Sequence, residues 1–426
     1  MKPLSWPRLL AFSSFGFALT LISNTLDPAI YGHQVLRLAP NNPNTLLGFS
    51  TAAASILAIF AAPIVGAWSD RTNSRWGKRK PFFLLGVPVL IVALYAIGLA
   101  PSIPIFVAGV LLYRLGDNLI FPPWEALYSD HVPGQQRGLA SGFKALTDIL
   151  AVLVGRFAAG ELMARAVERG NGAVVLAVSV PVVGLLFAVL ATWIALRGLV
   201  TAKSRTGSFR PPAGIRESFS INWKAHQDFL WWFINRILFW TGFVILGQFL
   251  LLFVIDVIGL GEADAQRYLA RLSLVLGGAI LLVAVPSGRL ADRIGRKPLI
   301  IAACALAAIG TVMVLIVRDL NWLTVAAALV GLGSGIYISS NFALLTDIVP
   351  AADAGKFLGL SNIAGAGGGA IARLLGGLLI DPINAATGSR AAGYLVLYTL
   401  AAVLFAASTW AALRLIDESK SKPGRN

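Results

Sequence analysis

The 426-residue chain is 57% hydrophobic and only 13% charged, and its formal net charge is +15. A soluble domain usually carries about 25% charged residues, so this composition excludes an ordinary water-soluble protein. The positive charge does not indicate nucleic-acid binding, because the cations stand in short loops between apolar runs and form no basic face on a soluble domain. We therefore expect the lipid bilayer as solvent and partner, and no nucleic acid.

Twelve apolar runs are long enough to cross a membrane, for which a helix needs about 20 residues. The first run follows the short basic segment MKPLSWPR; it is longer than the core of a signal peptide and has no clear cleavage site, so we predict that it is retained. The predicted spans are 9–32, 46–69, 81–101, 104–129, 139–164, 173–197, 227–258, 265–290, 297–317, 321–348, 356–381 and 391–415.

Loop charge predicts the orientation of these spans. The loops after even-numbered spans are rich in Lys and Arg, as in RTNSRWGKRK and RLADRIGRK, whereas loops such as LAPSIP after odd-numbered spans are poor in them. The cation-rich side is expected to be cytoplasmic, which places both termini inside. The long polar stretch at 198–226 divides the spans six and six, so we predict helical bundles at 1–197 and 227–426 joined by a cytoplasmic linker.

The two halves also match each other in sequence. Pro298 follows Pro81 by 217 positions, and Asp347 in DIVP follows Asp130 in DHVP by the same interval. One six-helix unit therefore occurs twice in the same orientation. Parallel repeats of this kind are typical of transporters, in which the substrate site lies between the halves at mid-depth in the membrane.

The basic blocks after the second and eighth spans contain the same pattern, Gly-x-x-x-Asp-Arg. Anchoring by cytoplasmic cations explains the positive charge but does not require this pattern twice. An Asp at the C-terminal end of a helix is unfavourable against the helix dipole and needs a partner, and glycine permits close helix approach. We predict a cytoplasmic gate whose charges pair only while the inner side is closed. Its residues are Gly66, Asp70, Arg71, Asp130, Gly288, Asp292, Arg293 and Asp347.

The twelve spans, the central loop and the paired motifs resemble the major facilitator superfamily, in which this loop locks the cytoplasmic side in one of two states. The longer stretches SRWGKRKPFFLLG and PPWEAL are similar to the glycoside–pentoside–hexuronide:cation symporters, which include melibiose permease and relatives of the sucrose transporters. This resemblance implies a secondary transporter with rocking halves that carries a sugar or glycoside.

The chain departs from these relatives at the positions that bind the coupling ion. Melibiose-type proteins carry acidic ligands at the positions of Ala58 and Ala62, and an Asp at the position of Ile120. The resemblance therefore implies that the sodium site is absent, which favours protons or no coupling at all. Sucrose transporters have Arg at the position of Glu125 and Asp at that of Arg114, so sucrose itself is not the expected substrate.

Ionisable side chains inside the predicted spans are candidates for the transport pathway, because a charge in the bilayer core is costly. Arg114 and Asp117 are three residues apart, and Lys144 and Asp148 are four apart, so each pair can meet on one helix face. Each pair can equally be a structural ion pair, and Lys144 can extend to the interface. The candidate pathway comprises Asp27, Arg114, Asp117, Asn118, Trp124, Lys144, Asp148, Asn235, Arg236, Trp240, Gln248, Asn362 and Arg373.

These residue types have the chemistry of a sugar site, in which charged and amide groups make paired hydrogen bonds and an aromatic ring covers the apolar sugar face. The same set can bind other polar solutes, and an aromatic side chain in a span more often packs in the core or faces lipid. Asp27 either faces an outer vestibule or sits at the interface. Arg236 is either a structural partner, an extended side chain near the interface or a ligand.

We expect a monomeric proton-coupled symporter of a sugar or glycoside that works by alternating access in the plasma (inner) membrane. Two alternatives remain open: a proton-coupled exporter of apolar compounds, and a non-transporting relative that assists pigment-complex assembly. No catalytic triad, metal set or phosphate loop stands out, and Cys304 is the single cysteine. We therefore expect neither an enzyme nor a bound cofactor, and the proton gradient as the energy source.

Overall fold

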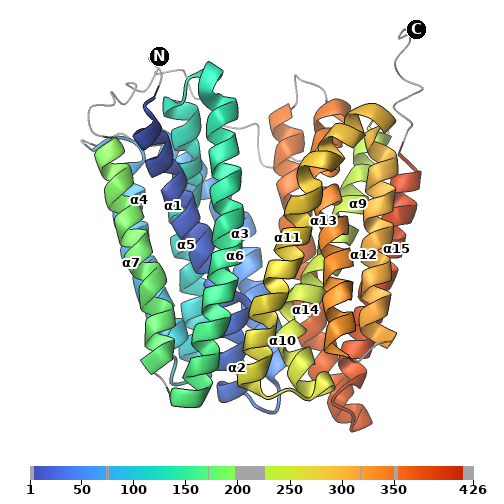
Figure 1. Ribbon diagram of the computed structural model, residues 1–426. Helices are drawn as coiled ribbons and strands as arrows, with labels where there is room; N and C mark the ends of the chain where they lie inside the picture. The colour runs from blue at the N-terminus through green and yellow to red at the C-terminus, as the bar shows by residue number, and fades with distance from the viewer. Residues whose placement is uncertain are drawn as a thin grey trace. The chain divides into compact units, whose positions relative to one another are not determined.

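The computed structural model describes residues 4–72, 74, 76–170, 172–196, 226–316, 319–349 and 354–415. Almost all of the predicted linker at 198–226 lies outside these residues. The described chain contains helices and no strand, and twelve of its helical segments are long and apolar enough to cross a membrane (Figure 1). Each segment overlaps one predicted span, so the prediction of an all-α, twelve-span chain is confirmed.

The helices group into two compact units. The first unit is Met1–Ser208 together with Leu260–Ser273, and the second is Phe209–Gly259 together with Leu274–Asn426. The first contains α1 (Trp6–Thr25), η1 (Leu26–Ile30), α2 (Tyr31–Leu38), α3 (Pro43–Arg71), α4 (Lys80–Gly98), α5 (Ile103–His131), η2 (Gly134–Gln136), α6 (Arg137–Arg169) and α7 (Gly172–Ala195).

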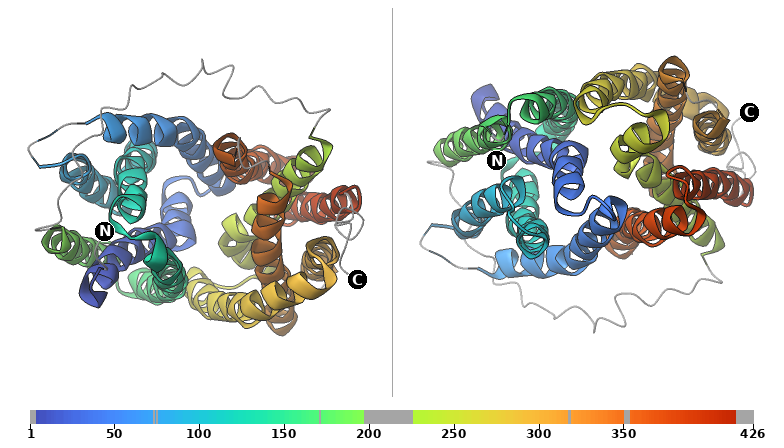
Figure 2. Two further views of the ribbon diagram at one scale, coloured as in Figure 1. Left: turned by 90° about the horizontal axis from the view of Figure 1, so that it is seen from above. Right: turned by 90° about the horizontal axis from the view of Figure 1, so that it is seen from below.

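The second unit follows the undescribed residues 197–225. It contains α9 (Gln227–Gln248), α10 (Leu250–Phe253), η3 (Val254–Ile258), most of α11 (Glu262–Ile294), α12 (Arg296–Ile316), α13 (Leu320–Ile348), α14 (Ala354–Thr387) and α15 (Ala392–Leu413). The seventh span, predicted as one run, is divided at Phe249, which has the non-helical angles φ −105° and ψ 7°. Seen along the helix axes in Figure 2, the helices of each unit stand side by side as a bundle.

The packing within the two units follows the sequence repeat. In the first, α1 packs on α6 and α7, and α4 packs on α5; in the second, α9 packs on α14 and α15, and α12 packs on α13. A Cβ atom at Gly116 would lie 3.1 Å from the backbone nitrogen of Leu90, and one at Gly333 would lie 3.2 Å from that of Ala307. Both residues of the second pair follow those of the first by 217 positions. Glycine thus permits the same close helix crossing twice.

Two local features turn the chain at the helix ends that carry candidate residues. Asp27 leaves the helical conformation, with φ −113° and ψ 121°, because a residue before proline is disfavoured in the α region. Gly295 has φ +89°, a left-handed conformation that favours glycine and ends α11 at Ile294. This turn lets α12 begin at Arg296, with its side chain near the end of α13.

Candidate functional site

At one end of the first unit, a single arginine joins the ends of two helices. The guanidinium of Arg79 lies 2.7 Å from the Asp70 carboxylate at the end of α3, and its Nε lies 3.0 Å from the Asp130 carboxylate at the end of α5. Arg79 also donates to Ser69 Oγ at 2.6 Å. The Arg79 side chain is 9% exposed, whereas Asp70 is 65% and Asp130 37% exposed. We name Asp70, Arg79 and Asp130 the Arg79 clamp.

The second unit repeats part of this clamp. Arg296 forms an ion pair with Asp347 at the end of α13, and it donates to the Ala343 carbonyl at 2.6 Å. Both residues of the pair follow Arg79 and Asp130 by 217 positions. The sequence analysis named the two aspartates but missed the two arginines. The signal was present, since Arg-Lys-Pro occurs at 79–81 and again at 296–298.

The remaining gate residues lie in the last two turns of α3 and α11. Arg71 is exposed at the end of α3, and Asp292 and Arg293 are exposed near the end of α11. A Cβ atom at Gly66 would lie 3.9 Å from Pro122 Cβ, an ordinary contact, and one at Gly288 would meet nothing within 4 Å. Packing within each unit therefore does not require glycine at these two positions, and their role in a gate stays a prediction.

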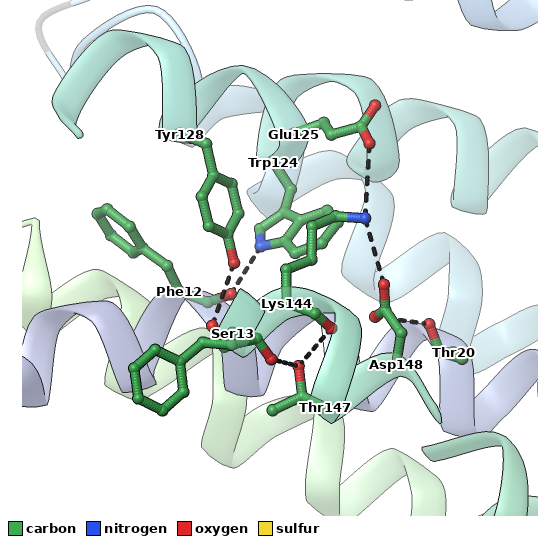
Figure 3. A network of polar contacts seen from close by, with 10 residues as sticks. Phe12, Ser13, Thr20, Trp124, Glu125, Tyr128, Lys144, Thr147 and Asp148 are labelled. Atoms are coloured by element: carbon green, nitrogen blue, oxygen red, sulfur yellow. Dashed lines mark hydrogen bonds and ion pairs between the residues drawn. The ribbon is translucent and has the colours of Figure 1, made fainter. Parts of the chain in front are cut away.

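Within the first unit, α5 and α6 bring two carboxylates to one lysine (Figure 3). Lys144 Nζ lies 3.2 Å from the Asp148 carboxylate and 3.7 Å from that of Glu125. Thr20 of α1 donates to Asp148 Oδ1 at 3.3 Å, and Lys144 Nζ lies 5.3 Å from the centroid of the Trp124 ring. We name these five residues the Lys144 cluster. The cluster carries a net charge of −1 when both carboxylates and the lysine are ionised.

The Trp124 side chain of this cluster is fixed by its packing and by a hydrogen bond. Its indole is fully buried and donates from Nε1 to the Phe12 carbonyl at 2.9 Å. A Cβ atom at Gly16 would lie 2.4 Å from the ring, so α1 can pass this close only because residue 16 is glycine. Tyr128, one turn further along α5, packs edge-on against Trp124 and shares a 3.3 Å hydrogen bond with Ser13. Trp124 is therefore fixed before any solute arrives.

The other predicted pair in this unit also forms. Arg114 lies 3.4 Å from the Asp117 carboxylate on α5, and Asn118 donates to the Arg114 carbonyl at 2.7 Å. Asp27 is half-buried in η1. Arg156 of α6, which was not among the predicted residues, donates to Asn24 Oδ1 at 3.0 Å. The first unit thus contains two further polar contacts, Arg114 with Asp117 and Arg156 with Asn24.

The second unit holds a buried network around Asn235 of α9. The Asn235 amide donates to the carbonyl and hydroxyl oxygens of Ser408 at 2.8 Å each, and its Oδ1 accepts from the Tyr337 hydroxyl at 2.7 Å. Asn341 Nδ2 donates to the Tyr337 oxygen at 3.1 Å. All four residues are almost fully buried. Sequence analysis found Asn235 but not the other three, because single Ser, Tyr and Asn residues in a span carry no distinctive pattern.

Arg236 lies next to this network. Its Nη1 donates to Asn341 Oδ1 at 2.7 Å, its Nε donates to the Ser361 carbonyl at 3.2 Å, and its guanidinium carbon lies 5.3 Å from the Trp232 ring centroid. Trp232 in turn donates to the Asn341 carbonyl at 3.0 Å. Arg236 is thus positioned by neutral groups, and no acidic side chain pairs with it among the residues that the structure describes.

The remaining candidates of the second unit are dispersed. Arg373 of α14 donates to Gln248 Oε1 at 2.9 Å. Trp240 is half-buried and packs edge-on against Phe243, while Asn362 is exposed on α14. The structure therefore brings Arg373 together with Gln248, and it places Trp240 one helical turn from Arg236 on α9.

Burial shifts two ionisable groups that lie outside the spanning segments. It lowers the pKa of His131, at the end of α5, against the opposing effect of the neighbouring Asp130 carboxylate. It raises the pKa of Asp256 in η3, against the effect of a 2.6 Å hydrogen bond from Tyr394. Among the described residues, no group of three or more His, Cys, Asp or Glu side chains is placed to hold a metal ion.

Comparisons with known proteins identify the family of this chain. The family model described as MFS/sugar transport protein matches residues 29–358. The chain is similar to sucrose transport protein SUT1 of Oryza sativa subsp. japonica, with 26% identity over 162 residues that cover 32% of this chain and 28% of that protein. It is also similar to sucrose transport protein SUC3 of Arabidopsis thaliana, with 27% identity over 168 residues that cover 34% of this chain and 27% of that protein.

These matches span less than a third of the length of each plant protein. Among solved structures, a bacterial homologue of the human lysosomal transporter Spinster has a TM-score of 0.71 at 16% identity, over 96% of this chain and 97% of that one. A likeness at this level of identity shows that the two chains share a fold.

Proposed function

The chain belongs to the MFS/sugar transport protein family and is a multi-pass membrane transporter, and from this membership we propose that it performs proton-coupled symport of a sugar or glycoside. We propose further that it works by alternating access in the plasma (inner) membrane, as a monomer with both termini in the cytoplasm. In this proposal it catalyses no chemical reaction and uses the proton gradient in place of a bound cofactor.

The observation that carries this proposal is the Lys144 cluster. Lys144 lies between two carboxylates and beside the fixed ring of Trp124. Carboxylates and an ammonium group can make paired hydrogen bonds to sugar hydroxyls, and the buried Trp124 ring supports the ammonium group at 5.3 Å. An export site for apolar compounds would not need three ionisable groups in the membrane, where each is costly.

The same cluster provides a route for proton coupling. When Asp148 takes up a proton, Lys144 loses its nearer partner and is left with Glu125 alone, 3.7 Å away. A nearby cation favours the ionised carboxylate, and separation from that cation favours the protonated one. Uptake of a proton and release of Lys144 to a solute are thereby linked. Asp117, which is paired with Arg114, is the second candidate for this role.

The two arginine–aspartate pairs support alternating access. Arg79 with Asp130 and Arg296 with Asp347 occupy equivalent positions in the two repeats. In each pair the aspartate lies at the end of one helix and the arginine at the start of another. Breaking or forming either ion pair can therefore shift two helices at once. Partly exposed ion pairs contribute about 1 kcal/mol or less each, so both conformations of a transport cycle stay accessible.

The test is uptake of a panel of radiolabelled sugars into proteoliposomes under an imposed proton or sodium gradient. We expect uptake driven by the proton gradient, abolished by a protonophore and independent of sodium. Asp148→Asn and Asp117→Asn should each abolish accumulation, and one of the two should retain exchange of internal for external sugar. Asp264→Asn is the matched control, because Asp264 also pairs with an arginine three residues away, at 3.5 Å, but is 70% exposed.

Three results would contradict the proposal. Sodium-stimulated uptake after collapse of the proton gradient would reject proton coupling. Normal accumulation in both Asp148→Asn and Asp117→Asn would reject the assigned proton carriers. Proton-driven extrusion of an apolar dye, with no uptake of any sugar, would favour the exporter instead.

A further inference from the structure

Arg236 is a cation inside a membrane span, and no acidic side chain among the described residues pairs with it. It is the tenth residue of α9, which places it about 14 Å from the start of the helix at about 1.5 Å per residue. In the part of the chain that the structure describes, its hydrogen-bond partners are an amide oxygen and a backbone carbonyl. In contrast, Arg114 and Lys144 in the first unit each have a carboxylate within 3.4 Å. Charges at such depth normally pair or mark a solute pathway.

The guanidinium of Arg236 has donors to spare. Arginine carries five N–H groups in a fixed planar fork, and two of them are used, one by Asn341 Oδ1 and one by the Ser361 carbonyl. The Nη2 side faces Gly365 on α14, where even an added Cβ would stay 3.9 Å away. The missing side chain leaves that side of the fork uncrowded. Two parallel N–H groups of arginine match the two oxygens of a carboxylate or phosphate.

The orientation of this fork is fixed by the surrounding network. The Asn341 amide nitrogen donates to Tyr337 at 3.1 Å and lies 3.4 Å from Asn235 Oδ1, which turns Asn341 Oδ1 toward Arg236. Asn235 is itself held by Ser408. Trp232 supports the guanidinium at 5.3 Å. A chain of buried contacts thus orients a charged group before any ligand arrives, as a binding site requires.

Trp240 provides an independent observation at the same place. It lies four residues after Arg236, on the same side of α9. Its indole nitrogen is buried, and it has no hydrogen-bond acceptor within the described residues. A buried N–H without an acceptor is unfavourable, and it calls for an explanation such as a bound group. One cationic fork and one unsatisfied indole donor therefore lie one helical turn apart.

We propose that Arg236 binds an oxyanion of the transported solute, a carboxylate or a phosphate, and that Trp240 donates its indole N–H to the same solute. This inference rests on the proposed function and narrows its substrate class to sugars that carry an acidic group. Asn235, Tyr337 and Asn341 are positioning residues that hold the fork in place. The neutral partners of Arg236 leave its charge available to the solute.

The experiment measures uptake of radiolabelled glucuronate, glucose phosphate and glucose by the full chain in proteoliposomes. We expect the wild-type protein to prefer an acidic sugar over glucose, and the two acidic probes distinguish a carboxylate from a phosphate. Arg236→Gln should weaken the apparent affinity for the acidic sugar at least tenfold, since hydrogen bonds to a charged group are lost. The affinity for glucose should change less than twofold.

Two further variants separate binding from folding. Asn341→Asp should weaken the affinity for the acidic sugar to a similar extent without removing the arginine. The new carboxylate would itself occupy the guanidinium of Arg236. Arg414→Gln is the matched control: Arg414 also stacks on a tryptophan four residues earlier, at 5.1 Å from Trp410, but is exposed at the end of α15. It should leave uptake of all three probes unchanged. The thermal stability of each variant in detergent would show whether the protein is folded.

Three outcomes would overturn this inference. In the first, the wild-type protein carries glucose but neither acidic sugar, which leaves the proposed function intact. In the second, Arg236→Gln lowers the affinity for acidic and neutral sugars alike, which assigns Arg236 a structural role. In the third, Asn341→Asp leaves acidic-sugar affinity unchanged in a folded protein. If no sugar is carried at all, the proposed function fails together with the inference.

Discussion

The Arg79 clamp leads to a quantitative prediction about stability. Replacing Arg79 by Gln removes the one cation that joins Asp70 at the end of α3 to Asp130 at the end of α5. It also removes the donor to Ser69, whose side chain is buried. The two carboxylates are then left near each other without their shared partner. We expect Arg79→Gln to destabilise the first unit.

The magnitude follows from the exposure of each partner. We assign about 1 kcal/mol to the contact with Asp130, which is 37% exposed, and about 1 kcal/mol to the bond that the guanidinium donates to the Ser69 hydroxyl. The contact with Asp70, which is 65% exposed, is screened by water and contributes about 0.5 kcal/mol. The expected loss is about 2.5 kcal/mol. Arg296→Gln, which loses Asp347 and one carbonyl, should cost about 2 kcal/mol.

The assay is the free energy of unfolding in mixed detergent micelles, with thermal stability as a second measurement. Lys78→Gln serves as the control, because Lys78 lies in the same loop and has no ion pair in the described part of the chain. An Arg79→Gln protein that loses no more free energy than Lys78→Gln would refute the reasoning, since the clamp would then be an ordinary surface ion pair.

Three further predictions concern packing, pH and the gate. Gly16→Ala should cost about 1–3 kcal/mol in a thermal unfolding assay, because its Cβ would lie 2.4 Å from the buried Trp124 ring, whereas Gly184→Ala, with nothing within 4 Å, should not destabilise α7. Equal losses in both variants would contradict this. Burial lowers the pKa of His131, so its contribution to stability is present above its unfolded pKa of about 6.5 and is lost as the pH falls through the folded value. His131→Gln should flatten that pH dependence, and an unchanged pH profile would argue against it. Asp292→Asn should raise cysteine-accessibility labelling of the inner vestibule and lower turnover while equilibrium binding changes little; unchanged labelling would leave the basic block as a membrane anchor.

Local properties of the sequence determine much of the fold. Runs of about 20 apolar residues specify membrane helices by length alone, and the twelve predicted spans all correspond to helices. The repeat at an interval of 217 positions indicated two similar six-helix units, and the same pairs of helices pack together in both. The spacing of Lys144 and Asp148 by four residues was also sufficient, because one helical turn brings such residues together.

What the sequence could not determine is which distant residues meet. Ser408 is 173 positions from Asn235, and Thr20 is 128 positions from Asp148, yet each makes a hydrogen bond there. Nothing local distinguishes these hydroxyls from others in the spans. The charge balance of Arg236 was equally open, since a cation in a span can pair with any carboxylate that the fold brings near it. Only tertiary packing settled that its neighbours within the described chain are an amide and a carbonyl, because contacts between helices depend on how whole helix faces fit together.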